Sequence, residues 1–159
     1  MTTFSQYIEG LCREHALILH SDKECHFSDL TSDFENKLKR QMHFPCVSID
    51  TDGFLFTGAP GNKWMRDQYN LYFLEHIRDA GSYTEVMAAF ARTRNLMLDF
   101  LRRMERDRKT GVQPMSAFEL IGTEGTRIEF KDAALYGWAV SVLVPTPFND
   151  VLCNENFNS

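Results

Sequence analysis

The segment FPCVSIDTDGFLFTG, residues 44–58, does most to decide how this chain is expected to fold. Apolar residues alternate with small or polar ones up to Ile49, and an apolar run resumes at Phe54. Asp52-Gly53 lies between the two halves, and Asp-Gly favours the positive φ angles of a tight turn between antiparallel strands. We therefore predict a β-hairpin over residues 44–58, with its turn at Asp52-Gly53.

More strands are predicted on both sides of the long central segment. Residues 64–78 alternate with period two and predict a third, antiparallel strand. Two short strands are predicted at 117–122 and 126–130, joined by Glu124-Gly125. A final strand is predicted at 136–144, and we expect Pro145 and Pro147 to end it because proline cannot donate to a strand ladder.

Three helices are predicted from capping patterns and helical spacing. Thr3 and Gln6 form a capping box before an apolar stripe that runs from Phe4 to Leu19. Leu30, Phe34 and Leu38 predict a short helix from Asp29 to Arg40, which could instead begin at a capping box formed by Ser32 and Glu35. Ser82 and Glu85 precede a long segment without Gly or Pro that predicts one helix from Tyr83 to Lys109.

The predicted order is α-α-β-β-β-α-β-β-β, which indicates an α+β fold. Consecutive strands with short connections favour an antiparallel sheet, and we expect the helices to pack on one face of it. The length of 159 residues suits one domain, predicted over 1–148. The Asn-rich residues 149–159 are expected to form a flexible, polar C-terminal arm.

Composition restricts the classes of function. The net charge of −5 argues against a dedicated nucleic-acid binder, because such binders need an excess of Lys and Arg to neutralise phosphates. Charged residues interrupt the first twenty positions, and no stretch approaches the length of a bilayer span, so neither a signal peptide nor a membrane span is expected. The four cysteines are expected to be reduced thiols, as in a cytosolic protein.

No residue pattern predicts catalysis or a metal site. A possible zinc cluster near the N-terminus matches no strong ligand spacing, although Cys and His are locally dense at Cys12, His15, His20, Cys25 and His26. His43 and Cys46 are three residues apart and would point to opposite faces of a strand. The acidic residues Asp50 and Asp52 are attributed to the turn, and the stretch GAPGNK at 58–63 lacks the spacing of a P-loop. We expect no catalytic residue, metal or cofactor.

The candidate functional residues are those of an interaction surface. Trp64, Met65 and Arg66 follow a Gly-Asn loop and are residue types enriched at protein interfaces, and Phe148 follows Pro147 at the start of the polar arm. The alternative for Trp64 is a core residue that anchors the start of a strand. The basic stretch from Arg102 to Lys109 contains Glu105 and Asp107, which favours a solvated, ion-paired helix face.

The layout over residues 27–148 resembles the small neck and tail-completion proteins of tailed phages and prophages. The resemblance lies in the segment at 44–58, the long strand and helix after it, and the late aromatic strand that begins Leu135-Tyr136-Gly137-Trp138. The short helix at 29–40 and the polar loop at 20–28 have no counterpart in it. The resemblance implies an antiparallel sheet flanked by helices, no enzymatic activity, and assembly as a ring with other tail or neck proteins. It also implies a location in the cytoplasm of the host bacterium and in the virion.

Two other classes of function stay open at the level of sequence. One is a small enzyme or ligand-binding domain with a pocket between sheet and helices, near Cys25, His26, His43 or Cys46. The other is a partner protein of the anti-toxin or immunity type. A ring-forming protein should give concentration-dependent oligomers, whereas a pocket protein can remain a monomer.

Overall fold

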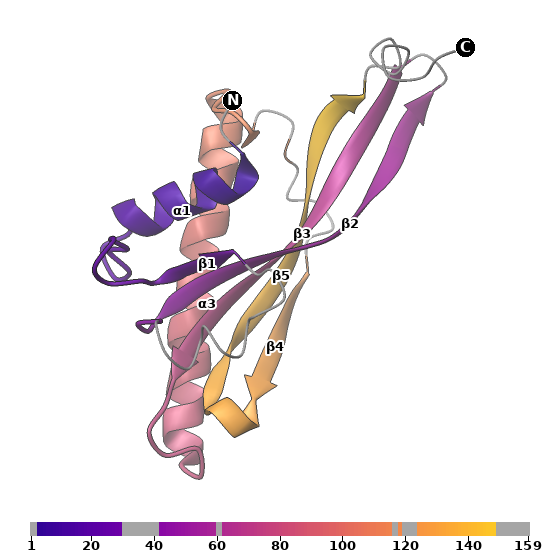
Figure 1. Cartoon of the computed structure of the whole chain (residues 1–159). Helices are drawn as coiled ribbons and strands as arrows, with labels where there is room; N and C mark the ends of the chain where they lie inside the picture. Colours follow the sequence, from indigo (N-terminus) through magenta and orange to yellow (C-terminus); the bar gives the residue numbers. More distant parts are fainter. Residues whose placement is uncertain (1–2, 30–41, 60–61, 116–117, 119–123, 149–159) are drawn as a thin grey trace, which may run out of the picture.

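The computed structural model describes residues 3–29, 42–59, 62–115, 118 and 124–148. For residues 62–63 and 146–148 it describes the backbone alone. The described elements are helices α1 (Phe4–Glu14) and α3 (Tyr83–Lys109) and the 3-10 turn η2 (Lys131–Ala133). The strands are β1 (Phe27–Asp29), β2 (Cys46–Ala59), β3 (Asn62–His76), β4 (Gly125–Phe130) and β5 (Leu135–Phe148). Figure 1 shows α1 and α3 beside a long, twisted sheet. The fold is therefore of the α+β class.

The five strands form one mixed sheet with the order β1-β2-β3-β5-β4. The prediction of a wholly antiparallel sheet is wrong at one edge, because β1 runs parallel to β2 and pairs Phe27 with Val47. All other neighbours in the sheet are antiparallel. A parallel neighbour cannot be joined by a tight turn, which is why local turn patterns did not indicate it.

The predicted turn at Asp52-Gly53 is also wrong. β2 continues through these residues, and the register with β3 shifts between Thr51 and Gly53. The extra residue is absorbed as a β-bulge, which bends and twists a strand without ending it. The antiparallel pairing of β2 and β3 extends to Ala59 opposite Asn62, so that the two strands form a much longer hairpin than expected.

β5 likewise extends past the point predicted for its end. Pro145 and Pro147 lie opposite Arg66 and Trp64 of β3, within a ladder that reaches Phe148. β4 pairs with β5 only as far as Val140, so this part of β5 has no partner on its other side among the described residues. Proline is tolerated in such an edge strand because no N–H is needed there.

The helix predictions are confirmed in part. Thr3 accepts a hydrogen bond from the Gln6 backbone and its own N–H donates to the Gln6 side chain, which is the predicted capping box. α1 ends at Glu14, however, and Leu17 and Leu19 beyond it are exposed. α3 has the predicted bounds and its Ser82 cap. The predicted helix at 29–40 lies outside the described residues except for Asp29, which belongs to β1.

The short strands before β5 give a similar result. The strand predicted at 126–130 corresponds to β4. The strand predicted at 117–122 lies outside the described residues except for Phe118, which is buried and is not in a strand.

The main core lies between the two helices and one face of the central strands. Phe4 of α1 contacts Tyr69 of β3, and Phe100 of α3 contacts Phe73 of β3. Tyr69 and Phe73 are four positions apart in β3, an even spacing, so both point to the same face of the sheet. We call this the helix-side face.

Two contacts fix the position of β5 against β3 and α3. The Trp138 indole N–H donates to the carbonyl of Phe90 in α3, at 2.9 Å. Gly137 lies so close to β3 that a Cβ atom on it would collide with the carbonyl oxygen of Phe73. Only glycine permits this approach, and the LYGW segment therefore determines how β5 lies against β3.

Candidate interaction surface

Strands β2, β3 and β5 continue past the segments that pair with β1 and β4. Residues 50–59, 62–70 and 141–148 form a three-stranded extension, which we call the distal sheet. Figure 1 shows it projecting away from the body that contains α1 and the middle of α3. The predicted interface residues Trp64, Met65, Arg66 and Phe148 all belong to this extension, although they lie in strands and not in an exposed loop.

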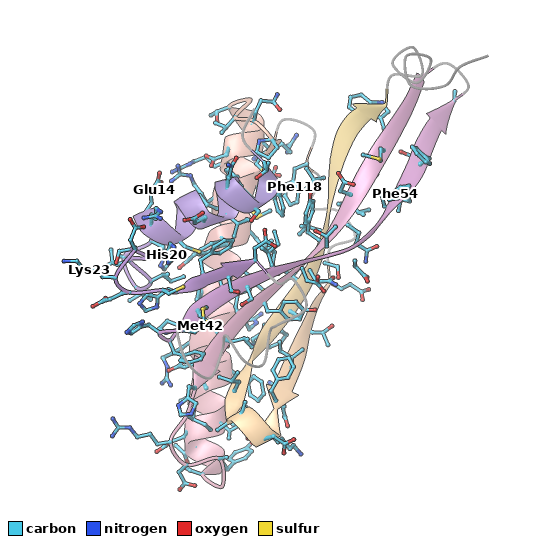
Figure 2. All side chains as sticks on the ribbon, viewed as in Figure 1. Glu14, His20, Lys23, Met42, Phe54 and Phe118 are labelled. Carbon is cyan, nitrogen blue, oxygen red and sulfur yellow. The ribbon has the colours of Figure 1, made fainter. Side chains whose placement is uncertain are left out.

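The helix-side face of the distal sheet is apolar and becomes exposed toward its end. Val142 and Val144 are buried near the base of the distal sheet. Further out, Phe54 is 62% exposed and Phe56 is 52% exposed. Their ring centroids are 5.5 Å apart, and Figure 2 shows Phe54 on the projecting part of the sheet.

These two phenylalanines continue the core face of the sheet. Phe54 lies opposite Asp67, and Phe56 lies opposite Met65. Met65 and Asp67 share the face of Tyr69 because successive side chains of a strand alternate. The surface that the helices cover in the body therefore extends, still apolar, onto a part of the sheet where large aromatic side chains meet solvent.

Asp67 places one charge within this apolar face. Its neighbours across the sheet are Phe54 and Val144, and its carboxylate has no hydrogen bond or ion pair to any described residue. Burial raises the pKa of Asp67 above its usual range. A carboxylate among apolar side chains is costly without a cation, so a partner with a positive group would stabilise it.

The opposite face of the distal sheet carries Trp64 and Arg66, both half-buried. Arg66 lies between Leu55 of β2 and Pro145 of β5, and its Nε atom is buried with no hydrogen-bond partner in the described part of the chain. Of the predicted set, Met65 thus lies on the helix-side face, and Trp64 and Arg66 lie on the other. For Phe148 only the backbone is described, opposite Lys63.

The residues considered for catalysis lie near the start of β2. His26 and His43 have ring centroids 5.5 Å apart, and the Nδ1 atom of His26 is 2.8 Å from the Pro45 carbonyl oxygen. Cys46 is fully buried, and burial, with a smaller contribution from Cys25, raises the pKa of its thiol. A thiol with a raised pKa is a poor nucleophile. No group of three or more potential metal ligands occurs within the described ranges.

The exposed pair Phe54 and Phe56 was missed at the level of sequence. Both residues belong to an apolar run that is typical of a buried hairpin, and alternation alone does not show where the covering helices end. The one available signal was the length of the apolar pattern in β2.

Comparisons with protein-family models, curated proteins and solved structures returned no match to this chain. Within the described residues, neither helix combines the length and the apolar character needed to cross a membrane.

Proposed function

We propose that this chain is a non-enzymatic structural protein that associates with copies of itself through the distal sheet, and that the assembly is a ring. The observation that carries the proposal is the exposure of Phe54 and Phe56 on a continuation of the core face. Large aromatic side chains grouped on a projecting surface are a common feature of protein interfaces.

The edges of the distal sheet support the same proposal. Pro145 and Pro147 remove two backbone donors from β5, which discourages another strand from adding at that edge. β2 contains no proline from Cys46 to Ala59. The β2 edge and the β5 edge of the distal sheet therefore differ in their capacity to bind another chain. When the two surfaces that meet in a contact are different, repetition of the contact can close a ring.

The resemblance to neck and tail-completion proteins of phages and prophages gives this proposal its biological setting. It adds other tail or neck proteins as partners, and it adds the host cytoplasm and the virion as locations. The net charge of −5 is compatible with a ring through which DNA passes without adhering.

The alternative of a small-molecule-binding or enzymatic domain with a pocket near Cys25, His26, His43 and Cys46 has less support. The Cys46 thiol is inaccessible, and His26 is engaged with the Pro45 carbonyl. The Cys46 thiol is therefore not accessible as a nucleophile, and the backbone engages the Nδ1 atom of His26.

The proposal is tested by sedimentation velocity over a wide range of protein concentrations, together with negative-stain electron microscopy. The wild-type chain should form discrete oligomers, seen as rings. Phe54→Ser should shift the distribution toward the monomer without lowering the melting temperature, because Phe54 is mostly exposed. Tyr83→Ser is the matched control, since Tyr83 is an exposed aromatic residue at the start of α3, outside the distal sheet. Equal effects of the two substitutions would contradict a specific role of the distal sheet.

A further inference from the structure

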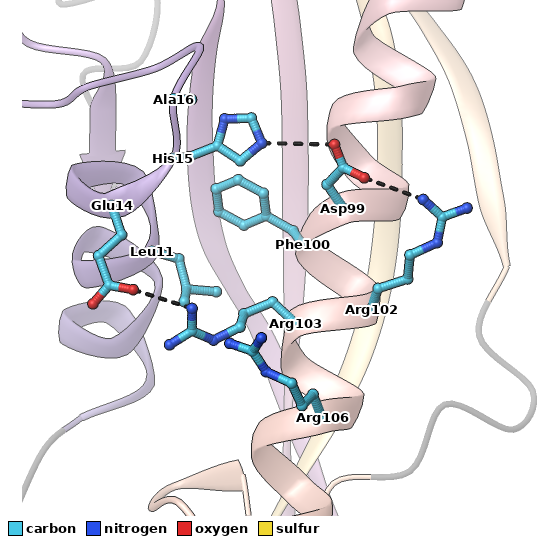
Figure 3. Close-up of a pocket in the computed structure, with 9 residues that line it drawn as sticks. All are labelled: Leu11, Glu14, His15, Ala16, Asp99, Phe100, Arg102, Arg103 and Arg106. Atoms are coloured by element: carbon cyan, nitrogen blue, oxygen red, sulfur yellow. Dashed lines mark hydrogen bonds and ion pairs between the residues drawn. The ribbon is translucent and has the colours of Figure 1, made fainter.

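A groove between α1 and α3 has the features of a receptor for the distal sheet. It encloses about 490 Å³ and is lined by Leu11, Glu14, His15, Ala16, Asp99, Phe100, Arg102, Arg103 and Arg106. Leu11 and Phe100 supply apolar side chains, and the arginines and acidic residues lie around them (Figure 3). Leu17 and Leu19, which follow the groove residue Ala16, add exposed apolar surface beside it.

The three arginines differ in how far they are engaged. Arg103 donates to both carboxylate oxygens of Asp107 and contacts Glu14 at 3.2 Å. Arg102 donates to Asp99 at 3.1 Å (Figure 3). Arg106 makes one described ionic contact, 3.8 Å from its Nε atom to Asp107, and its side chain is 64% exposed.

Asp107 is shared between Arg106 and two closer donors. It already accepts hydrogen bonds from the Tyr7 hydroxyl and from the Arg103 Nε atom. The guanidinium of Arg106 makes no hydrogen bond to a described residue and keeps its donors available at the edge of the groove.

The distal sheet and the groove are complementary in apolar surface and in charge. The helix-side face of the distal sheet presents exposed phenylalanines around one uncompensated carboxylate, Asp67. The groove presents apolar side chains and, in Arg106, a guanidinium that makes no hydrogen bond to a described residue. Within one chain the outer part of the distal sheet, with Phe54, projects away from α1 and the middle of α3 (Figures 1 and 2), so that docking of Phe54 on the groove would join two copies.

We propose that the helix-side face of the distal sheet of one copy docks on the α1–α3 groove of the next copy, with Phe54 against the apolar part of the groove and Asp67 paired with Arg106. This inference depends on the proposed self-association and names the two surfaces that carry it. The contact is heterologous, since each subunit offers one surface to each of two neighbours. Repetition of such a contact closes a ring when the rotation between neighbours permits it.

Charge reversal at the two positions tests the pairing. Asp67→Lys and Arg106→Glu should each raise the dissociation constant of assembly by about tenfold or more, because each brings like charges together. The double variant Asp67→Lys, Arg106→Glu should assemble, since every contact again joins opposite charges. An equimolar mixture of the two single variants should also reassemble, because the two kinds of subunit can alternate so that opposite charges meet.

Matched controls separate local pairing from general charge effects. Asp52→Lys changes an exposed acidic residue of the distal sheet that lies against Gln68, on the opposite face. Arg94→Glu changes an exposed arginine of α3 that lines a different hollow, beside Trp138. Both controls should assemble like the wild type, and circular dichroism should show all variants folded.

The outcomes distinguish this inference from the function on which it rests. If the wild type forms oligomers and Arg106→Glu forms them equally well, the groove is not the receptor, although self-association stands. If both single variants dissociate and neither their mixture nor the double variant recovers, the two residues do not pair. If the wild type remains a monomer at all concentrations, the proposed function itself is wrong.

Discussion

Replacing Tyr7 with Phe removes a buried hydrogen bond that joins the two helices. The Tyr7 hydroxyl donates to Oδ2 of Asp107 at 2.9 Å, across 100 positions of sequence, and Asp107 is 5% exposed. A hydrogen bond to a charged group contributes about 1.5–3 kcal/mol. Asp107 keeps its bonds from Arg103, so we expect a loss of about 2 kcal/mol in the free energy of unfolding.

For a chain of this size that loss corresponds to a fall of about 4–8 °C in melting temperature. Urea unfolding at neutral pH measures it at concentrations that keep the protein monomeric. Tyr136→Phe is the control, because Tyr136 is also buried but its hydroxyl has no hydrogen bond to a described residue. A change of less than about 0.5 kcal/mol for Tyr7→Phe would refute the role given to this bond.

The same bond has a defined pH dependence. Burial, and then the hydrogen bond to Asp107, raises the pKa of Tyr7 above that of a free tyrosine. A raised pKa in the folded state gives stability that is fully present below the unfolded pKa and is lost as pH rises toward the folded value. The advantage of the wild type over Tyr7→Phe should therefore be largest at neutral pH and should shrink above about pH 10. A constant difference across this range would contradict the assignment.

Three further predictions concern the sheet. Gly137→Ala should lower the free energy of unfolding by more than about 3 kcal/mol or prevent folding, since the added Cβ would meet the Phe73 backbone. The control is Gly10→Ala in α1, where a Cβ has open space. It should raise the free energy of unfolding by about 0.5–1 kcal/mol in thermal unfolding. Asp67→Asn should raise the melting temperature of the monomer at pH 7, because burial disfavours the charged form of Asp67 and so raises its pKa. The gain in melting temperature should vanish as pH falls below the ordinary Asp pKa. A lower melting temperature at pH 7 would refute this. Trp64→Ala should weaken assembly in sedimentation while costing less than the roughly 3–5 kcal/mol of a core aromatic, and unaltered assembly would remove Trp64 from the interface.

Local patterns predicted those parts of the fold that local physics determines. The capping residues Thr3 and Ser82 mark the starts of α1 and α3 because their side chains satisfy the first free backbone N–H groups. The absence of Gly and Pro up to Lys109 was sufficient to give the extent of α3.

The errors arose where a distant part of the chain decides the outcome. β2 continues past Asp52-Gly53 because β3 pairs along its whole length and a bulge absorbs the irregularity. β5 continues past Pro145 because it still pairs with β3 there. On its other edge, beyond Val140, no described strand requires a backbone N–H from β5. In each case the pairing of strands outweighs the turn or breaker tendency of one residue.

The candidate surface could be predicted only in outline. Trp64, Met65 and Arg66 were selected by residue type, and they do lie in the distal sheet. The exposure of Phe54 and the isolation of Asp67 depend on where the helices cease to cover the sheet, and the availability of Arg106 depends on how Tyr7 and Arg103 occupy Asp107. Such properties follow from the three-dimensional arrangement and not from a local pattern.

The most direct test of self-association through the distal sheet is sedimentation velocity on the wild type and on Phe54→Ser at matched concentrations. We predict that the wild type changes from the 18.4 kDa monomer to a discrete larger species as concentration rises, and that Phe54→Ser makes this change only at much higher concentration. A wild-type chain that sediments as the monomer throughout, or a variant that assembles as readily as the wild type, would contradict the account.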